Sequence, residues 1–240
     1  MALFGLIGGD KPTQKNIDKQ VSKVKERYAQ PEYRRAAMDR LLEWGTPEAL
    51  LGLMQRFTVV AQSPHWDEEE KRWLVDELAQ RGDAARQAIV RFLKTENYVA
   101  FAAKALRRLV DDATYVADLV EALRSHPPED HRSVQAKQEL VAALGESGDV
   151  RALEAVLPYL DDHSDDVRCT AVDVVERHTV TAGYARLTET LAEDHHSARV
   201  LRHIAGAASR LSLEIDASRP LAPAVAEDYT VTNGKLTRPT

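Results

Sequence analysis

Apolar residues recur along most of this chain at intervals of three and four residues, the spacing that places them on one face of an α-helix. The clearest instance is the stretch 148–178, GDVRALEAVLPYLDDHSDDVRCTAVDVVERH. It predicts a helix over 150–160, a short acidic turn, and a second helix over 165–177. Weaker copies of this pattern occur on both sides, so the sequence predicts an all-α chain of about five to six stacked helical hairpins.

Proline, glycine and capping residues bound the other predicted helices. Pro31 is suited to the first position of a helix, and Gly45 to the left-handed position that ends one. Thr46 is a typical N-cap before Pro47, and Gly82 is a typical stop. These signals and the apolar period predict helices over 16–28, 31–44, 47–61, 67–81, 84–94, 98–110 and 114–124, one that ends near 148, and two over 182–192 and 197–211.

Three segments follow from this pattern: an apolar N-terminal arm over 1–13, the repeat region over 14–211, and an irregular C-terminal tail over 212–240. Within the tail, DYTVTNGKLTR predicts a short β-hairpin, because Asn233-Gly234 suits a type I′ turn. An isolated hairpin is marginal in water, so we expect the tail to cover the last repeat.

The predicted second helices share a motif: a cation, a small or apolar residue three positions later, and an apolar residue four after that. The first hairpin has Tyr33-Arg34, Ala37, Leu41 and Gly45, and the fifth has Val167-Arg168, Ala171 and Val175 without the glycine. The second hairpin has Glu70-Lys71, Leu74, Leu78 and Gly82. The third has Tyr98-Val99, Ala102, Leu106 and Val110, without the cation, and the fourth and sixth match only loosely.

In this motif the chain resembles the HEAT repeat family over roughly residues 14–211. The Asp-rich fifth unit is most similar to the short HEAT-like repeats of the phycobilisome-lyase type. The resemblance implies a right-handed α-α solenoid that holds a protein partner on the concave face formed by its second helices.

Composition and charge narrow the functional classes. The net charge is −6, but residues 1–110 hold 19 Lys and Arg against 15 Asp and Glu, whereas residues 111–240 hold 13 against 23. The overall acidity argues against nonspecific nucleic-acid binding. A lone cysteine, Cys169, suits a reducing compartment, so we expect a cytoplasmic protein. No apolar run has the ~20 residues of a membrane span, although residues 2–9 leave contact with a membrane or a partner as an alternative.

Three clusters contain residue types that bind metals: His126 with His131, Asp194-His195-His196, and the acidic run 161–166. All three fall in predicted turns, where polar residues and helix caps are expected without a metal. No His-Glu dipeptide occurs, which argues against the HEAT-like iron enzymes. The sequence therefore predicts no catalytic residue, no metal ligand and no cofactor.

Our leading hypothesis is a non-enzymatic scaffold or adaptor that binds a protein partner. The candidate partner-binding residues are Arg34, Arg35, Lys71, Arg72, Arg168, Asp173 and Arg177. One alternative is a nucleic-acid-binding or HEAT-like DNA glycosylase-type protein that uses the basic N-terminal half with Trp73 and Asp76. Another is an accessory factor in pigment or cofactor attachment.

Overall fold

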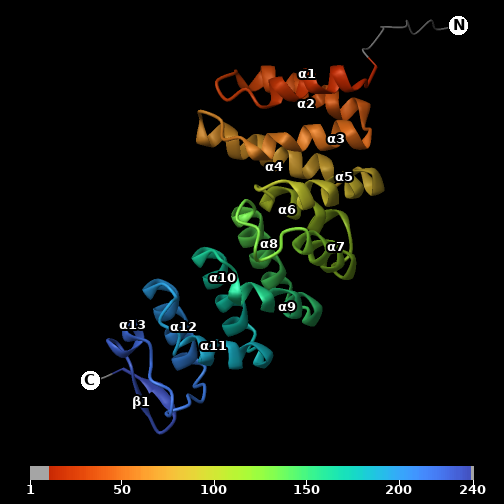
Figure 1. Ribbon diagram of the computed structural model, residues 1–240. Helices are drawn as coiled ribbons and strands as arrows, with labels where there is room; N and C mark the ends of the chain where they lie inside the picture. Colours follow the sequence, from red (N-terminus) through yellow and green to blue (C-terminus); the bar gives the residue numbers. More distant parts are fainter. Residues whose placement is uncertain (1–10, 239–240) are drawn as a thin grey trace, which may run out of the picture. The chain divides into compact units, whose positions relative to one another are not determined.

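The computed structural model describes residues 11–238, which are mostly helical (Figure 1). The first helices are α1 (Gln14–Val24), α2 (Pro31–Trp44), α3 (Pro47–Met54), the 3₁₀ helix η1 (Gln55–Thr58), α4 (Pro64–Leu78), α5 (Gly82–Thr95) and α6 (Ala100–Leu109). They are followed by α7 (Asp112–Arg124), α8 (Val134–Ser147), α9 (Val150–Val156), η2 (Leu157–Asp161), α10 (Asp165–Arg177), η3 (Thr181–Gly183), α11 (Tyr184–Thr190), α12 (Ala198–Arg210) and α13 (Pro223–Ala226). The remaining elements are the strands β1 (Thr230–Thr232) and β2 (Lys235–Thr237).

The predicted N-terminal arm lies outside the described residues except for residues 11–13. Among the described residues, no helix combines the length and the apolar character that crossing a bilayer requires.

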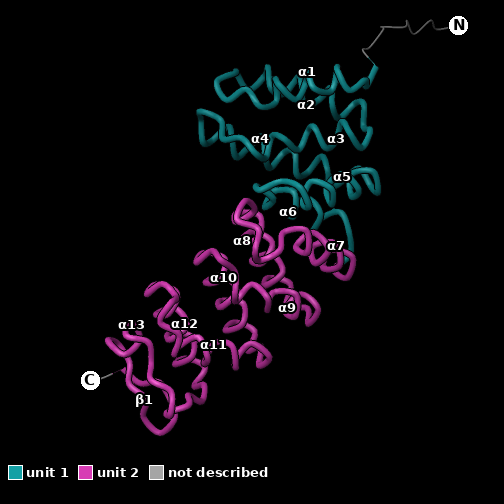
Figure 2. The backbone as a smooth tube through the Cα atoms, viewed as in Figure 1, with its two compact units in different colours: residues 1–111 teal, residues 112–240 magenta. Residues whose placement is uncertain are grey.

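The chain divides into two compact units, residues 1–111 and 112–240 (Figure 2). In the first unit, α1 packs on α2 and α3, α3 packs on α5, and α4 packs on α6. In the second unit, α7 packs on α8 and α9, and α10 packs on both α8 and α12. First helices therefore contact first helices at α1, α3 and α5 and at α7 and α9. Second helices contact second helices at α4 and α6 and at α8, α10 and α12.

The apolar motif positions form the interior of each hairpin. Ala37, Leu41, Leu74, Ala171 and Val175 are all buried, as the sequence predicts. A close helix approach occurs at Gly145 of α8, where an added Cβ would lie 2.4 Å from a methyl group of Val174 in α10. A side chain at that position would force the two helices apart.

Five of the six second helices are followed by a left-handed residue that lies eleven positions after the motif cation or its equivalent. These residues are Gly45, Gly82, Gly148, Thr179 and Ser212, with φ between 49° and 65°. In the fourth and sixth units, which the sequence matched only loosely to the motif, Lys137 and Leu201 lie eleven residues before Gly148 and Ser212. In the fifth unit, Thr179 adopts the conformation that glycine favours elsewhere.

The third hairpin is the exception. Its second helix, α6, ends at Val110 in an extended conformation with φ −125°. The first compact unit ends at the next residue, Asp111.

Two predicted helices are shorter than their apolar pattern suggested. The helix expected over 150–160 becomes 3₁₀ from Leu157, because Pro158 has no N–H for the α-helical hydrogen bond. The helix expected over 47–61 likewise ends at Met54 and continues as η1. Conversely, α4 begins at Pro64, three residues before the predicted start, with proline at a favourable first position.

The tail covers α12, as expected. Both α13 and β2 pack against α12, and Val225, Tyr229 and Leu236 are buried. The β-hairpin turns at Asn233 and Gly234, whose φ values of 52° and 74° fit the predicted type I′ turn.

One ion pair in the second unit is fully buried. Lys137 of α8 lies 2.6 Å from Asp162, which immediately follows η2, and both side chains have no exposed surface. Lys137 Nζ also donates to the carbonyl of Pro128 at 3.0 Å, and Asp162 accepts from the backbone N–H of Ser164. The pair thus joins the fourth hairpin to the fifth.

We expect Asp162→Asn to lower the free energy of unfolding by about 3 kcal/mol, because it leaves a buried ammonium without a counter-charge. The double variant Lys137→Met/Asp162→Asn should recover most of that loss, since no buried charge then remains. Urea unfolding of the wild type and the variants measures both effects. Equal stability of Asp162→Asn and wild type, or no recovery in the double variant, would contradict this interpretation.

Candidate functional site: the groove between α2 and α4

The first unit contains a buried ionic cluster where α2, η1 and α4 meet. Arg56 of η1 is fully buried and donates to Glu70 at 2.7 Å and to Asp67 at 2.6 Å, both in α4. Arg34 of α2 reaches across to Glu70 with two nitrogens, at 2.8 and 3.0 Å. Lys71 completes the cluster by donating to Asp67 at 2.7 Å.

The cluster keeps the carboxyl of Asp67 ionised. Burial raises the pKa of Asp67, but hydrogen bonds from Lys71, from the Ala61 backbone N–H and from Arg56 outweigh it, so the pKa lies below its ordinary value. The guanidinium of Arg34 also donates to the carbonyls of Ala29 and Glu26. Nearly every donor of the cluster is therefore satisfied within the protein, and its charges are not available to a ligand.

Long side chains, rather than packed backbones, join α2 to α4. Close backbone approaches connect α4 to α6 and α8 to α10, but few connect α2 to α4. Arg34 and Glu70 span the gap, whereas Gly145 lets α8 and α10 touch. A groove of about 490 Å³ opens on the surface above this gap.

We call this surface the aromatic groove. Its apolar lining consists of Pro31, Ala36, Trp66 and Trp73. Its polar lining consists of Glu32, Arg35, Asp39, Glu69 and Glu70. The volume falls in the range of ligand-binding clefts, and the combination of indole rings with a few charged groups is typical of recognition sites.

One end of the aromatic groove is filled by the protein's own side chain. The guanidinium of Arg35 lies 3.4 Å from the centre of the Trp73 ring, and it pairs with Asp39 at 3.0 Å. At the other end, Trp66 is 47% exposed. A second hollow of about 190 Å³, lined in part by Tyr28, Gln30 and Gln62, lies on the far side of Trp66 and shares Pro31 with the groove.

The candidate residues from the sequence fall into two groups. Arg34, Lys71 and Arg168 are buried in ion pairs, which makes them structural rather than partner-facing in this structure. Arg35, Arg72, Asp173 and Arg177 are exposed. Arg35 is the only one of the seven that lines the aromatic groove.

Sequence reasoning missed several groove residues. The helix predicted over 67–81 excludes Trp66, Trp73 entered only the nucleic-acid alternative, and Glu32 and Glu69 were not candidates. The available signal was the seven-residue spacing of Trp66 and Trp73, which places both on one face of a helix once α4 is known to begin at Pro64.

Several exposed basic residues of the first unit are paired with carboxylates of the chain itself. Arg40 pairs with Glu43, Arg72 with Glu68, and Arg108 with Asp76. This pairing removes the main argument for the nucleic-acid alternative, which requires cations available to phosphates.

The acidic run 161–166 is likewise occupied by cations. Asp161 pairs with Arg186, Asp165 with Arg168, and Asp166 with Arg199. Together with the Lys137 pair of Asp162, these contacts account for every carboxylate of the run. The sequence attributed the run to helix capping, but the N-cap residue of α10, Ser164, makes no side-chain capping hydrogen bond. Its backbone N–H instead donates to Asp162 within the preceding turn.

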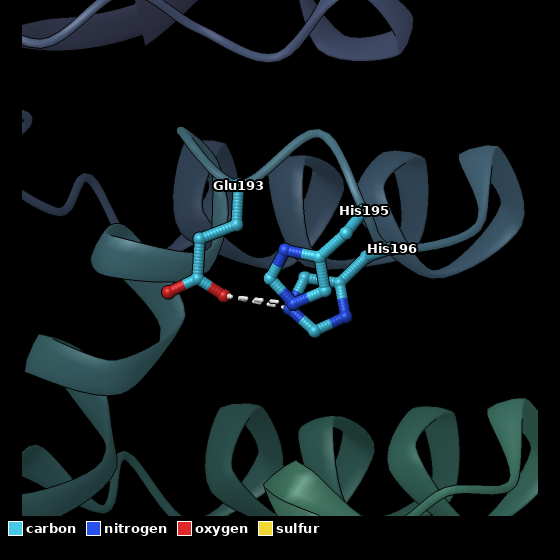
Figure 3. Close-up of side chains that lie close together, drawn as sticks. All are labelled: Glu193, His195 and His196. Carbon is cyan, nitrogen blue, oxygen red and sulfur yellow. Dashed lines mark hydrogen bonds and ion pairs between the residues drawn. The ribbon is translucent and has the colours of Figure 1, made fainter.

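Glu193, His195 and His196 form a cluster in which one ligand atom from each lies within 4.8 Å of the others (Figure 3). His196 Nε2 lies 2.7 Å from Glu193, and its Nδ1 lies 2.5 Å from an Arg168 nitrogen. Arg186 donates to both oxygens of Glu193. Because these hydrogen bonds engage the atoms a metal would use, the cluster is better explained as part of the polar network around α10.

We expect Zn²⁺ at micromolar concentration to leave the melting temperature of this protein unchanged, because a metal would have to displace Arg168 and Arg186. Thermal unfolding with Zn²⁺ and with a chelator tests this. A rise in melting temperature that His196→Ala abolishes would show that the cluster is a metal site.

Glu193 should contribute to the acid stability of the second unit. Hydrogen bonding to Arg186 lowers the pKa of Glu193 from 4.5 to about 2. A lowered pKa stabilises the folded state above pH ~4.5 and loses that effect as the pH falls towards 2. Glu193→Gln should be less stable than wild type by about 1–2 kcal/mol at pH 6. Urea unfolding at several pH values should show this difference shrinking towards pH 2; a difference independent of pH would contradict it.

Comparisons with known proteins add nothing to this geometry. No protein-family model matches the chain, and neither a curated protein nor a solved structure matches it. The functional argument therefore depends on the residues of the aromatic groove.

Proposed function

We propose that this protein is a non-enzymatic scaffold or adaptor that holds a segment of a protein partner in the aromatic groove. The proposal includes its architecture, a right-handed solenoid of HEAT-like hairpins. The regular left-handed helix ends and the buried motif cations support that architecture, because each is a recurring device at the same position of successive hairpins.

The observation that carries the functional proposal is the exposure of large apolar side chains in the unit that contains the groove, where Trp66 lines the groove and Tyr28 lines the second hollow. Five large apolar side chains of the first unit are exposed: Tyr28, Tyr33, Val60, Trp66 and Tyr98. Among the described residues, only Val150 in the second unit is exposed to a similar degree. Exposed aromatic residues beside a groove are typical of protein interfaces, in which tryptophan and tyrosine supply much of the binding energy.

The chemistry of the groove supports binding rather than catalysis. Its buried acid, Glu70, is held by two arginines, and Asp39 is paired with Arg35. These groups serve to shape the groove.

The double variant Trp66→Ala/Trp73→Ala should lose the partner that the wild-type protein captures. A photo-crosslinking amino acid at position 69 should crosslink that partner, whereas the same amino acid at position 154, an exposed site in α9, should not. Mass spectrometry of the crosslinked species measures both outcomes. Val150→Ala, which removes an exposed side chain outside the groove, is the control.

Two results would count against the proposal. One is a partner retained equally by the double variant and the wild type. The other is crosslinking from position 154 but not from position 69.

A further inference from the structure

The aromatic groove contains one complete cation site made by the chain itself. At Trp73 the three components are an indole face, the guanidinium of Arg35 on that face, and the carboxylate of Asp39 beside the guanidinium. Such an arrangement combines a cation–π contact with a charge-assisted hydrogen bond. It shows which chemistry this groove accommodates.

A second indole lies two helical turns away on the same face of α4. Trp66 is 47% exposed, and Glu32 and Glu69 line the groove with it. Within residues 11–238, the ion-pair partner of Glu69 is His65, at 3.3 Å and with both side chains largely exposed. The Trp66 end therefore has an indole and carboxylates, as the Trp73 site does. The guanidinium of Arg35, however, lies at the Trp73 end.

We propose that the Trp66 end of the aromatic groove binds a lysine or arginine side chain of an extended protein segment. The inference rests on the proposed function and names the chemistry of the partner. The bound cation would lie against Trp66 and pair with Glu32 and Glu69, as Arg35 does with Trp73 and Asp39.

The charges around the groove favour a cation over an anion. Glu70 is already neutralised by Arg34 and Arg56, so the attraction comes from Glu32 and Glu69 on the rim. An anionic ligand would have to approach these two carboxylates. On the far side of Trp66, Arg27 is present, but it donates to the carbonyl of Val60.

The second hollow favours a peptide over a small amine. It continues past Trp66 and offers the side chains of Gln30, Gln62 and Ser63, which can hydrogen-bond a peptide backbone. A free amine would fill the Trp66 end and leave this hollow empty. An extended segment can occupy both.

The probe is a fluorescein-labelled peptide, Gly-Ser-Lys-Gly-Arg-Gly-Ser, titrated with the full chain and followed by fluorescence anisotropy. Trp66→Ala should weaken binding about tenfold, which is within the range of a partly desolvated cation–π contact. Glu32→Gln/Glu69→Gln should weaken it about fivefold at low salt and flatten its salt dependence. The matched control, Glu154→Gln/Glu214→Gln, removes two exposed carboxylates of the second unit and should change affinity less than about twofold.

Two further peptides separate failure of this inference from failure of the proposed function. In one, leucine replaces the lysine and arginine; in the other, glutamate does. Suppose that the leucine or glutamate peptide binds in a Trp66-dependent way and the cationic peptide does not. The proposal that the Trp66 end binds a cation would then be overturned, whereas the proposal that the groove binds a peptide would stand.

If no peptide binds in a Trp66-dependent way, both proposals fail. The inference would also be overturned if Glu32→Gln/Glu69→Gln and Glu154→Gln/Glu214→Gln weakened binding of the cationic peptide equally. The effect would then come from the overall negative charge of the protein. A wild-type dimer that Trp66→Ala converts to a monomer would assign the groove to a second copy of the chain, and would also overturn the inference.

Discussion

Buried cations paired with carboxylates constrain how the second helices of this protein pack. Arg34, Lys71, Lys137 and Arg168 occupy the same motif position, and all four are buried. A buried charge without a partner would cost several kcal/mol, so each cation must find a carboxylate nearby. In all four cases a contact of the cation extends to the next hairpin: Arg34 to Glu70, Lys71 to the ring of Phe101, Lys137 to Asp162, and Arg168 to His196.

The same constraint creates the groove. Where a small residue such as Gly145 allows close contact, the neighbouring second helices pack against each other. Between α2 and α4, the Arg34–Glu70–Arg56 cluster fills the space with long polar side chains, and few close backbone approaches remain. The indole rings of Trp66 and Trp73 then line an open surface instead of a packed seam. The buried ionic cluster thus separates α2 from α4 and leaves room for the proposed binding surface.

Much of the fold was predictable because its signals are local. Pro31, Gly45, Thr46 and the Asn233-Gly234 turn each act through their own backbone conformation, and the structure has them in the predicted roles. No motif residues were assigned from the sequence in the fourth and sixth hairpins, although the eleven-residue interval from Lys137 to Gly148 is present in the sequence. A β-branched residue such as Thr179 gives no sequence signal for a left-handed position.

The site was far less predictable. From sequence alone, a charged residue at a motif position is taken to be exposed and available to a partner protein, because its ion-pair partner is not known. The ion-pair partner of Arg34, Glu70, is 36 positions away in the chain. The helix α4 begins at Pro64, so Trp66 lies on the same helix face as Trp73. The apolar pattern had placed residues 64–66 in the linker before this helix. Pairing and exposure of this kind arise from tertiary packing, which local periodicity does not encode.

The most direct test of the account is ¹⁹F NMR of the protein labelled with 5-fluorotryptophan. The chain has three tryptophans, of which Trp66 and Trp73 line the aromatic groove and Trp44 does not. Titration with the lysine- and arginine-containing peptide should shift the resonances of Trp66 and Trp73 and leave that of Trp44 in place. A titration that moves Trp44 alone, or moves none of the three while the peptide binds, would contradict the assignment of the groove as the binding surface.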